Sequence, residues 1–286
     1  MAVILDGKSL ALKLRENIRI ETEKLIEQYH KQPHLVVILI GENPASQSYV
    51  KSKEKACIKA GIKSTVIRKD ADISEKELID IIKTLNNDDS VHGILLQLPI
   101  PKHLDEDKII NLINPTKDVD GFCNDNVARL NKGQDALVPC TPLGITKILD
   151  EYQIDATGKH CVIIGRSQIV GKPMAALMLK RNATVTMCHS KTTDIKSITK
   201  QADILIVAIG RANMVDASYV KPGAVVIDVG INRVDDQLTG DVLYDDVEKV
   251  CGYITPVPGG VGKMTIACLL DNTLTCYKRI EGEKND

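Results

Sequence analysis

Short apolar runs that end at or near a glycine recur along this chain, and they constrain its fold more than any other feature. Their β-branched and leucine residues follow one another with little polar alternation, which is typical of strands buried on both faces of a parallel sheet. The runs are Leu35–Gly41, Gly93–Gln97, Cys161–Gly165, Ala183–Met187, Ile204–Gly210 and Ala224–Gly230. Helical patterns separate the runs, so the sequence predicts a doubly wound α/β architecture.

Several of these helical patterns have recognisable start signals. Ser74 followed three residues later by Glu77 is a capping box. Thr141 followed by Pro142 predicts an N-cap with proline at the first helical position. Apolar residues at helical spacing predict a further helix from Thr265 to about Lys278.

The length of 286 residues predicts roughly two domains. A polar stretch at Asn131–Pro139 is the expected crossing between them. We expect a first domain over residues 1–139 that is completed by a C-terminal helix at 264–286, and a second domain over 140–263. A simple two-part division of the chain remains the alternative.

Charge and cysteine usage exclude several classes of protein. Lys+Arg total 37 and Asp+Glu total 38, so the net charge is −1. The chain lacks the excess of positive charge that is typical of proteins that bind nucleic acid or an anionic membrane. No apolar run approaches the roughly 20 residues that span a bilayer, and the start before Asp6 is too short for a signal peptide. The eight cysteines are scattered without a Cys-x-x-Cys pair, which predicts a reducing, cytoplasmic setting and no structural zinc.

Lys53 is the first candidate for chemistry. The segment from Pro44 to Gly61 predicts a helix, on which Tyr49 and small residues share the face of Lys53 while Lys51 points almost the opposite way. A lysine on that face is partly desolvated, which favours its neutral form and suits it to proton transfer. The alternative is a lysine that snorkels at the edge of the core.

Two polar residues follow as candidate partners. Gln97 interrupts an apolar strand near its carboxyl end, where its side-chain carbonyl can accept a hydrogen bond from a lysine. Asp120 lies in a loop before Gly121 and can hold a ligand by accepting two N–H donors. An edge-strand glutamine facing water and a simple Asp-Gly turn are the structural alternatives.

The segment from Gly165 to Gly171 has the setting of a dinucleotide-binding turn, because it follows an apolar strand and precedes a helical pattern. Ser167 stands where the standard motif has its middle glycine. Arg166 lies in the turn, and Ser190 closes the next strand where an NAD site often carries an acidic residue. A serine with a nearby arginine suits a 2′-phosphate, so the pattern favours NADP over NAD. A strand–turn–helix without nucleotide is the alternative.

The segment Pro256–Gly262 combines two prolines with three glycines and no charge. Proline stiffens a loop and glycine lets the backbone approach another group closely. A tight structural turn would account for it in isolation, but its occurrence with the motifs above favours a ligand-contacting loop.

Together these motifs resemble the bifunctional methylenetetrahydrofolate dehydrogenase/methenyltetrahydrofolate cyclohydrolase family, nearly from end to end. The resemblance is carried by Gly41-x-x-Pro-Ala-Ser46, Tyr49-x-x-x-Lys53, Leu96-Gln-Leu-Pro-x-Pro101, Lys117-Asp-Val-Asp-Gly-Phe122, Pro139-Cys-Thr-Pro142, Gly165-Arg-Ser-x-x-Val-Gly-x-Pro-Met174, Cys188-His-Ser190 and Pro256-Val-Pro-Gly-Gly-Val-Gly262. It implies two α/β domains around a cleft, the second a Rossmann-like dinucleotide-binding domain, in a homodimer. It also implies NADP-dependent oxidation of methylenetetrahydrofolate and hydrolysis of the methenyl product to formyltetrahydrofolate.

The same resemblance implies roles for individual residues. Lys53 would transfer protons in hydrolysis, Gln97 would tune it, Tyr49 would orient the folate and Asp120 would grip the pterin. The implied folate contacts also include Pro258, Gly259 and Gly260. The implied cofactor contacts are Gly165, Arg166, Ser167, Gly171, Ser190 and Ile231.

One residue departs from the family pattern. The family commonly has proline after the Gly-Gly-Val-Gly run, where this chain has Lys263. We expect this change to affect ligand affinity rather than the type of reaction. An NADP-linked oxidoreductase of the shikimate dehydrogenase kind and a non-catalytic dinucleotide sensor are the competing functions.

Overall fold

The computed structural model describes residues 2–283 of the chain. These residues form two compact units, each assembled from three segments. Unit 1 comprises residues 2–12, 130–134 and 139–265. Unit 2 comprises residues 13–129, 135–138 and 266–283. The functional domain boundaries that we predict from the sequence stay a proposal, and each unit is described by itself.

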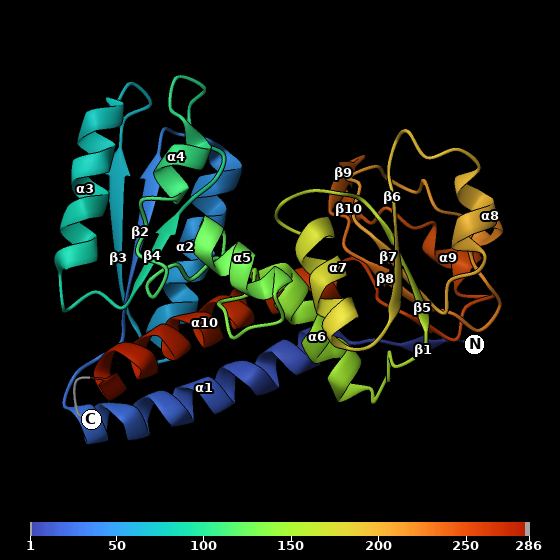
Figure 1. Ribbon diagram of the computed structural model, residues 1–286, viewed down its shortest axis with the longest axis horizontal. Coiled ribbons are helices and arrows are strands. Elements are labelled where there is room, and N and C mark those ends of the chain that lie inside the picture. Colours follow the sequence, from blue (N-terminus) through green and yellow to red (C-terminus); the bar gives the residue numbers. More distant parts are fainter. Residues whose placement is uncertain (1, 284–286) are drawn as a thin grey trace. The chain divides into compact units, whose positions relative to one another are not determined.

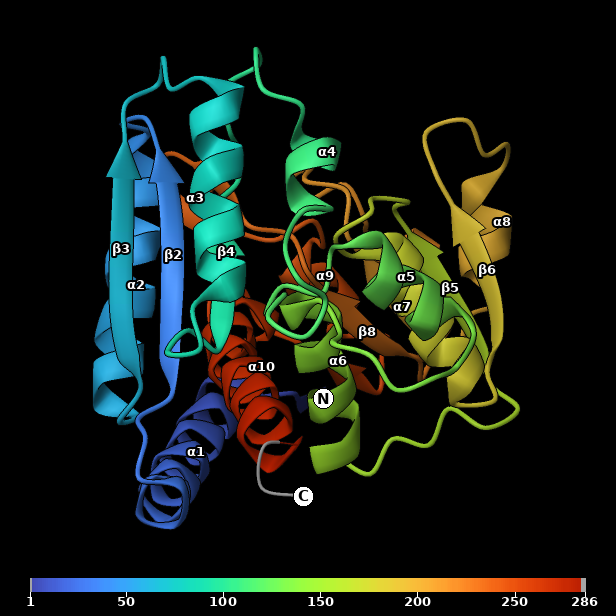
Figure 2. The same ribbon diagram turned by 60° about the vertical axis from the view of Figure 1, so that its left-hand side comes forward.

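Unit 2 contains a three-stranded parallel sheet of order β3-β2-β4, built from β2 (His34–Ile40), β3 (Lys63–Lys69) and β4 (Gly93–Leu96). Helix α2 (Pro44–Lys59) joins β2 to β3, and α3 (Glu75–Asn87) joins β3 to β4. Since β3 and β4 flank β2 on opposite sides, right-handed crossovers place α2 and α3 on opposite faces of the sheet (Figures 1 and 2). The sheet therefore has a topological switch point between β2 and β4, where ligands bind in folds of this kind.

Four more helices contribute residues to unit 2. They are α1 (Gly7–Tyr29), α4 (Glu106–Ile110), α5 (Asn124–Asn131) and α10 (Val261–Glu283). The ion pair between Lys278 and Glu21, at 2.8 Å, joins the unit 2 portions of α10 and α1. The core of the unit lies between the sheet and its helices, and its fully buried members include Ile38, Leu78, Ile82, Ile94 and Ile109.

Unit 1 contains a six-stranded parallel sheet of order β1-β11-β8-β7-β5-β6. Its strands are β1 (Val3–Ile4), β5 (His160–Ile164), β6 (Thr184–Cys188), β7 (Ile204–Val207), β8 (Val225–Asp228) and β11 (Tyr253–Ile254). The chain runs from β5 outward to β6 and then returns to β7 on the other side of β5, so the switch point lies between β5 and β7. This is the predicted Rossmann-like arrangement, and the predicted α/β fold class is confirmed.

Helices cover both faces of the unit 1 sheet, with α6 and α7 on one face and α8 and α9 on the other (Figure 1). Their bounds, with those of the short helix η1, are α6 (Cys140–Glu151), α7 (Gly171–Lys180), α8 (Ile195–Thr199), η1 (Ala217–Tyr219) and α9 (Tyr244–Val247). A two-stranded antiparallel hairpin, β9 (Asn232–Val234) and β10 (Gln237–Thr239), stands apart from the large sheet. Ile164, Leu205, Val207 and Val226 are among the buried residues of the core.

The predicted start of one helix and the predicted bounds of another are wrong. Helix α6 begins at Cys140 with Pro139 as its N-cap, so Thr141 is not a cap and Pro142 is the third helical residue. Proline is tolerated there because the first N–H groups of a helix have no intrahelical acceptor. Helix α10 begins at Val261, not near Thr265, so the end of the Pro256–Gly262 segment is already helical. By contrast, Ser74 caps α3 as predicted, accepting from the Glu77 N–H at 3.2 Å.

All eight cysteines are buried free thiols. Burial raises the pKa of Cys57, Cys123 and Cys161 to about 12. No helix within residues 2–283 combines the length and apolar character needed to cross a membrane. Within the same range, His, Cys, Asp and Glu side chains form no group of three that could hold a metal ion.

Candidate active site

Helix α2 positions the candidate lysine of unit 2. The side chain of Asn43 caps the helix by accepting from the N–H groups of Ala45 and Ser46, and Pro44 occupies its first position. The helix ends before Gly61, which adopts a φ of +75° that favours glycine. These two signals fix the frame of the helix and therefore the direction in which each of its lysines points.

Lys53 is 5% exposed, whereas Lys51 and Lys55 of the same helix are exposed. The predicted division of the helix into a solvated face and a buried face is confirmed. The Lys53 ammonium donates a hydrogen bond of 3.0 Å to Oε1 of Gln97 and lies 4.6 Å from the centroid of the Tyr49 ring. A buried ammonium needs such partners, because burial removes its water. Lys53, Gln97 and Tyr49 thus form one cluster.

Gln97 reaches this cluster from the switch point of the unit 2 sheet. Its backbone N–H donates to the carbonyl of Ile38 on β2, directly after β4 ends at Leu96. Its side-chain N–H donates to the carbonyl of Leu98 at 2.7 Å. Because this bond uses the amide nitrogen, the amide oxygen is directed at Lys53. Gln97 is 9% exposed, so the alternative of a water-facing glutamine is wrong.

The loop that carries Asp120 is held by two neighbouring charged residues. Lys117 is buried and donates to the carbonyls of Leu85, Asn86 and Asp88, at distances of 2.8 to 3.0 Å, where α3 ends. Asp118 is also buried and accepts hydrogen bonds of 2.9 to 3.0 Å from the N–H groups of Gly121 and Cys123 and from the Asn126 amide.

Asp120 itself is half-buried. A parallel bridge pairs Ile94 of β4 with Asp118, so the chain at Asp120 runs beside the end of β4 that leads into Gln97. Asp118 accounts for the turn, and Asp120 stands next to the strand end. The two carboxylates of the motif therefore differ in role: Asp118 stabilises the loop through hydrogen bonds, and Asp120 is the candidate for contact with a ligand.

In unit 1, the turn after β5 fits the close approach of a ligand. Gly165 has a φ of +130°, and a Cβ there would lie 2.3 Å from the carbonyl oxygen of Ala208. A Cβ on Gly171, the first residue of α7, would lie 2.4 Å from the carbonyl oxygen of Gly165. Only glycine fits at either position, so the backbone of the turn packs directly against the start of the helix. This is the cradle that a dinucleotide phosphate requires at a helix N-terminus.

The side chains of this turn are of two kinds: that of Ser167 bonds within the turn, and that of Arg166 is exposed to solvent. The hydroxyl of Ser167 accepts from the N–H groups of Val170 and Gly171 at 3.2 and 3.3 Å. These two bonds give Ser167, which stands where the standard motif has its middle glycine, a structural role within the turn. Arg166 in the turn and Ser190 after β6 are both exposed. They are thus accessible to a ligand at the carboxyl edge of the sheet.

The Pro256–Gly262 segment also lies in unit 1 and lines a cavity of about 120 Å³. Pro258, Gly259 and Gly260 form one wall, and Ile231 belongs to the opposing segment that follows β8. Lys263, in the first turn of α10, also lines the cavity. The structure therefore brings Ile231 together with the proline–glycine loop, in the unit that holds the dinucleotide turn.

Two family models match this chain. A tetrahydrofolate dehydrogenase/cyclohydrolase catalytic domain matches residues 5–120, and the NAD(P)-binding domain of the same family matches residues 139–281. The chain belongs to the tetrahydrofolate dehydrogenase/cyclohydrolase family. All four candidate residues of unit 2 lie in the first match, and the dinucleotide turn and the proline–glycine loop lie in the second.

Relatives of this tetrahydrofolate dehydrogenase/cyclohydrolase match it over nearly its whole length. Bifunctional protein FolD of Oceanobacillus iheyensis is 56% identical, with 97% of this chain and 98% of the relative covered. The crystal structure of the bifunctional enzyme FolD from Campylobacter jejuni is 50% identical, with a TM-score of 0.95 and coverage of 98% and 100%. The FolD of Trypanosoma brucei, solved with NADP cofactor and an inhibitor, is 36% identical, with a TM-score of 0.93 and coverage of 97% and 98%.

Sequence reasoning missed one polar residue beside the cavity of this family member. Asp228, the last residue of β8, is 4% exposed and accepts from the N–H groups of Gly230, Asp241 and Val242. Burial raises its pKa to about 6. The sequence did contain a signal for this residue, because an aspartate near the end of an apolar strand needs hydrogen-bond partners.

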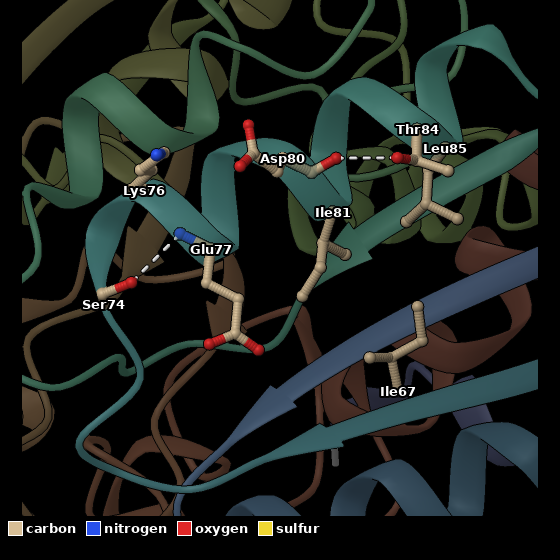
Figure 3. Close-up of a pocket in the computed structure, with 8 residues that line it drawn as sticks. All are labelled: Ile67, Ser74, Lys76, Glu77, Asp80, Ile81, Thr84 and Leu85. Carbon is tan, nitrogen blue, oxygen red and sulfur yellow. Dashed lines mark hydrogen bonds between the residues drawn. The ribbon is translucent and has the colours of Figure 1, made fainter.

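A second hollow, in unit 2, contains none of the predicted site residues. Figure 3 shows it between α3 and β3, where Ile67, Ile81 and Leu85 form an apolar floor. Polar residues of α3 surround this floor, and two of them are used within the helix region: Ser74 caps it, and the Thr84 hydroxyl donates to the carbonyl of Asp80.

Proposed function

We propose that this chain is a bifunctional enzyme of one-carbon metabolism that acts on tetrahydrofolate derivatives. It oxidises 5,10-methylenetetrahydrofolate with NADP⁺ to 5,10-methenyltetrahydrofolate and NADPH. It then adds water to the methenyl cation and releases a proton, which gives 10-formyltetrahydrofolate. The observation that carries this proposal is the buried contact of Lys53 with Gln97 and Tyr49, within residues that match the family's catalytic domain.

Hydrolysis is assigned to the cluster in unit 2. Water must lose a proton as its oxygen attacks the methenyl carbon, and Lys53 is the amine that exchanges that proton. Gln97 holds the lysine at 3.0 Å and keeps it from rotating away. Tyr49 orients the folate ring, and Asp120 accepts hydrogen bonds from N–H groups of the pterin. Lys51 and Lys55 point to solvent from the same helix, so we assign them no part in the reaction.

Oxidation needs alignment more than acid–base chemistry. The reacting carbon lies between two nitrogens, whose lone pairs stabilise the cation left when hydride departs. Bound NADP⁺ accepts that hydride. The chain's own residues bind and orient the reactants, so no dedicated base is required. Pro258, Gly259 and Gly260 are assigned to the folate side of this alignment.

The cofactor is assigned to unit 1. The cradle at Gly165 and Gly171, in which a Cβ would meet backbone, fits a dinucleotide phosphate. Ser167 completes the turn, Ile231 contacts the cofactor, and Arg166 with Ser190 binds the 2′-phosphate that distinguishes NADP from NAD. The structure of the Trypanosoma brucei relative with NADP supports this choice of cofactor.

The competing functions are less well supported. A shikimate dehydrogenase has no need of the Lys53, Gln97 and Tyr49 cluster, and a dinucleotide sensor has no need of a catalytic domain. The match of the family's catalytic model to residues 5–120 therefore favours the bifunctional enzyme over both.

The deciding experiment is an absorbance assay with methylenetetrahydrofolate and NADP⁺. We expect transient methenyl product, followed by its decay to formyltetrahydrofolate. Methenyltetrahydrofolate supplied without cofactor should decay faster with the enzyme than without it. Tight NADP binding without folate turnover would contradict the proposal and favour a sensor.

We also propose a homodimer in a cytoplasmic, reducing compartment. Support for the compartment comes from the eight cysteines, all of them free thiols. Sedimentation velocity of the purified chain tests the assembly, and a monomer at micromolar concentration would contradict it.

A further inference from the structure

The carboxylate of Asp241 is fully buried and holds a turn of the backbone. Its Oδ2 accepts from the N–H groups of Ile209 and Gly210 at 2.8 and 2.9 Å. Its Oδ1 accepts from the N–H of Arg211 at 2.8 Å. Three successive N–H groups thus surround one carboxylate, as they would surround a bound anion. A buried charge with this many donors fixes the turn, because every alternative leaves a charge or an N–H without a partner.

The turn held by Asp241 lies at the switch point of the unit 1 sheet. It follows Ala208, whose N–H donates to Ile164 of β5 at 2.8 Å. The carbonyl of Ala208 is the atom that a Cβ on Gly165 would meet at 2.3 Å. The turn at Ile209–Arg211 therefore continues directly from the backbone on which the dinucleotide turn rests.

Asp241 also holds the segment that lines the cavity. Its Oδ1 accepts from the side-chain amide of Asn232 at 2.9 Å, one residue after Ile231. A Cβ on Gly230 would lie 2.3 Å from this carboxylate, so the cavity wall packs directly on it. The backbone N–H of Asp241 donates in turn to Asp228 at 3.0 Å. One side chain thus joins the segments that leave β7 and β8.

We propose that Asp241 is a positioning residue for the cofactor site, which sets the Ile209–Arg211 turn and the Gly230–Asn232 segment in register at the carboxyl edge of the sheet. It acts through these backbone segments and does not touch the reacting atoms. The proposal rests on the assignment of NADP to unit 1. It predicts a selective effect, because hydrolysis of methenyltetrahydrofolate needs Lys53 in unit 2 and no cofactor.

The test replaces Asp241 by asparagine, which keeps the shape of the side chain. The asparagine amide nitrogen cannot accept a hydrogen bond. Two of the N–H groups that bond to the carboxylate would therefore face another donor, and the Ile209–Arg211 turn or the Asn232 segment must shift. We expect the NADPH dissociation constant, measured by fluorescence titration, to rise at least about tenfold, a loss of roughly 1.4 kcal/mol. Cofactor-free hydrolysis of methenyltetrahydrofolate should stay within about twofold of wild type, since a factor of two is under 0.5 kcal/mol.

Asp203→Asn is the matched control. Asp203 also accepts from a backbone N–H, that of His160 at 2.9 Å, but it lies just before β7, at the amino edge of the same sheet. Its replacement should leave NADPH affinity and the ratio of the two activities unchanged. Equal losses of both activities in Asp241→Asn, or unchanged NADPH affinity, would overturn the positioning role.

A second variant keeps the test valid if Asp241→Asn does not fold. Asn232→Ala removes one of the four donors from the carboxylate, and it should raise the NADPH dissociation constant at least about threefold, within the worth of one hydrogen bond. Unchanged affinity in this variant would overturn the proposal. A wild-type protein that neither binds NADPH nor oxidises methylenetetrahydrofolate would instead contradict the proposed function.

Discussion

Lys53 and Gln97 are separated by 44 positions in the sequence, yet the lysine ammonium donates to the glutamine side chain at 3.0 Å. Each residue drew attention for the same kind of reason: the lysine lies on the buried side of a helix, and the glutamine interrupts an apolar strand. Each alone has an ordinary structural explanation. Their contact gives a buried cation a polar partner that a solvated lysine would not need.

Replacing Lys53 by methionine keeps the length of the side chain and removes the amine. We expect cyclohydrolase activity to fall at least roughly 10²-fold, the scale of lost acid–base catalysis. Dehydrogenation should partly survive, so methenyl product should accumulate in the absorbance assay. Lys55→Met on the exposed face of the same helix is the control. Undiminished hydrolysis by a folded Lys53→Met protein would remove this lysine from the mechanism.

Cofactor choice is tested by the double variant Arg166→Ala with Ser190→Asp. Aspartate repels a 2′-phosphate and can accept from a free 2′-hydroxyl. The Michaelis constant for NADP should therefore rise much more than that for NAD. Both constants are measured with saturating methylenetetrahydrofolate. Parallel losses for the two cofactors would show that the adenosine ribose lies elsewhere.

Gly171→Ala tests the cradle itself. The added Cβ would lie 2.4 Å from the carbonyl oxygen of Gly165, so the turn must move away from α7. NADPH affinity should fall at least about tenfold, while cofactor-free hydrolysis persists. Gly282→Ala, where a Cβ meets only the Tyr29 hydroxyl at 3.9 Å, is the control. Wild-type NADPH affinity in Gly171→Ala would argue against a phosphate at this turn.

Acid should destabilise unit 2 through two buried histidines. Burial lowers the pKa of both His34 and His92 below the ordinary value of 6.5. The unfolded chain therefore binds more protons than the folded protein just below pH 6.5. The stability that the neutral rings provide is present above the unfolded pKa and is lost as pH falls through the lower folded pKa.

Urea unfolding at pH 8 and at pH 5.5 measures this effect. His92→Gln should lose less stability on acidification than wild type. His30→Asn, at an exposed position with a φ of +55° that asparagine tolerates, should keep the wild-type pH dependence. An unaltered slope in His92→Gln would show that other groups govern the acid response.

Lys263→Pro restores the residue type common in the family. Lys263 is exposed, and its N–H donates a long bond of 3.2 Å to Gly260, so proline costs little at this third helical position. An exposed cation is worth about 0–1 kcal/mol to a bound anion, and salt weakens it. We expect a small rise in the Michaelis constant for folate or NADP that shrinks at high salt. Lys263→Ala separates charge from stiffness, and a salt-independent collapse in turnover would contradict the electrostatic interpretation.

Local patterns predicted β2, β4 and β5 to β8, together with the burial of Lys53, because helical and strand periods are properties of neighbouring residues. The edge strand β3 was missed, because its sequence KSTVIRK is mostly polar and half-exposed rather than a buried apolar run. Non-local features were not predictable in this way. Strand β1 is two residues long and pairs with β11 some 250 positions later, so it has no period to detect. Asp241 bonds mainly to backbone N–H groups, which every non-proline residue carries, and its partners therefore leave no signature in the sequence.

Because every cysteine is buried, the native protein should react only slowly with thiol-labelling reagents. A maleimide or aromatic disulfide reagent needs an accessible thiolate, and burial denies both access and ionisation at the native sites. A single cysteine introduced on an exposed face, such as position 55 of α2, would therefore carry a fluorophore or spin label almost alone. Without that addition, the rate at which the native thiols become reactive reports directly how often the fold opens.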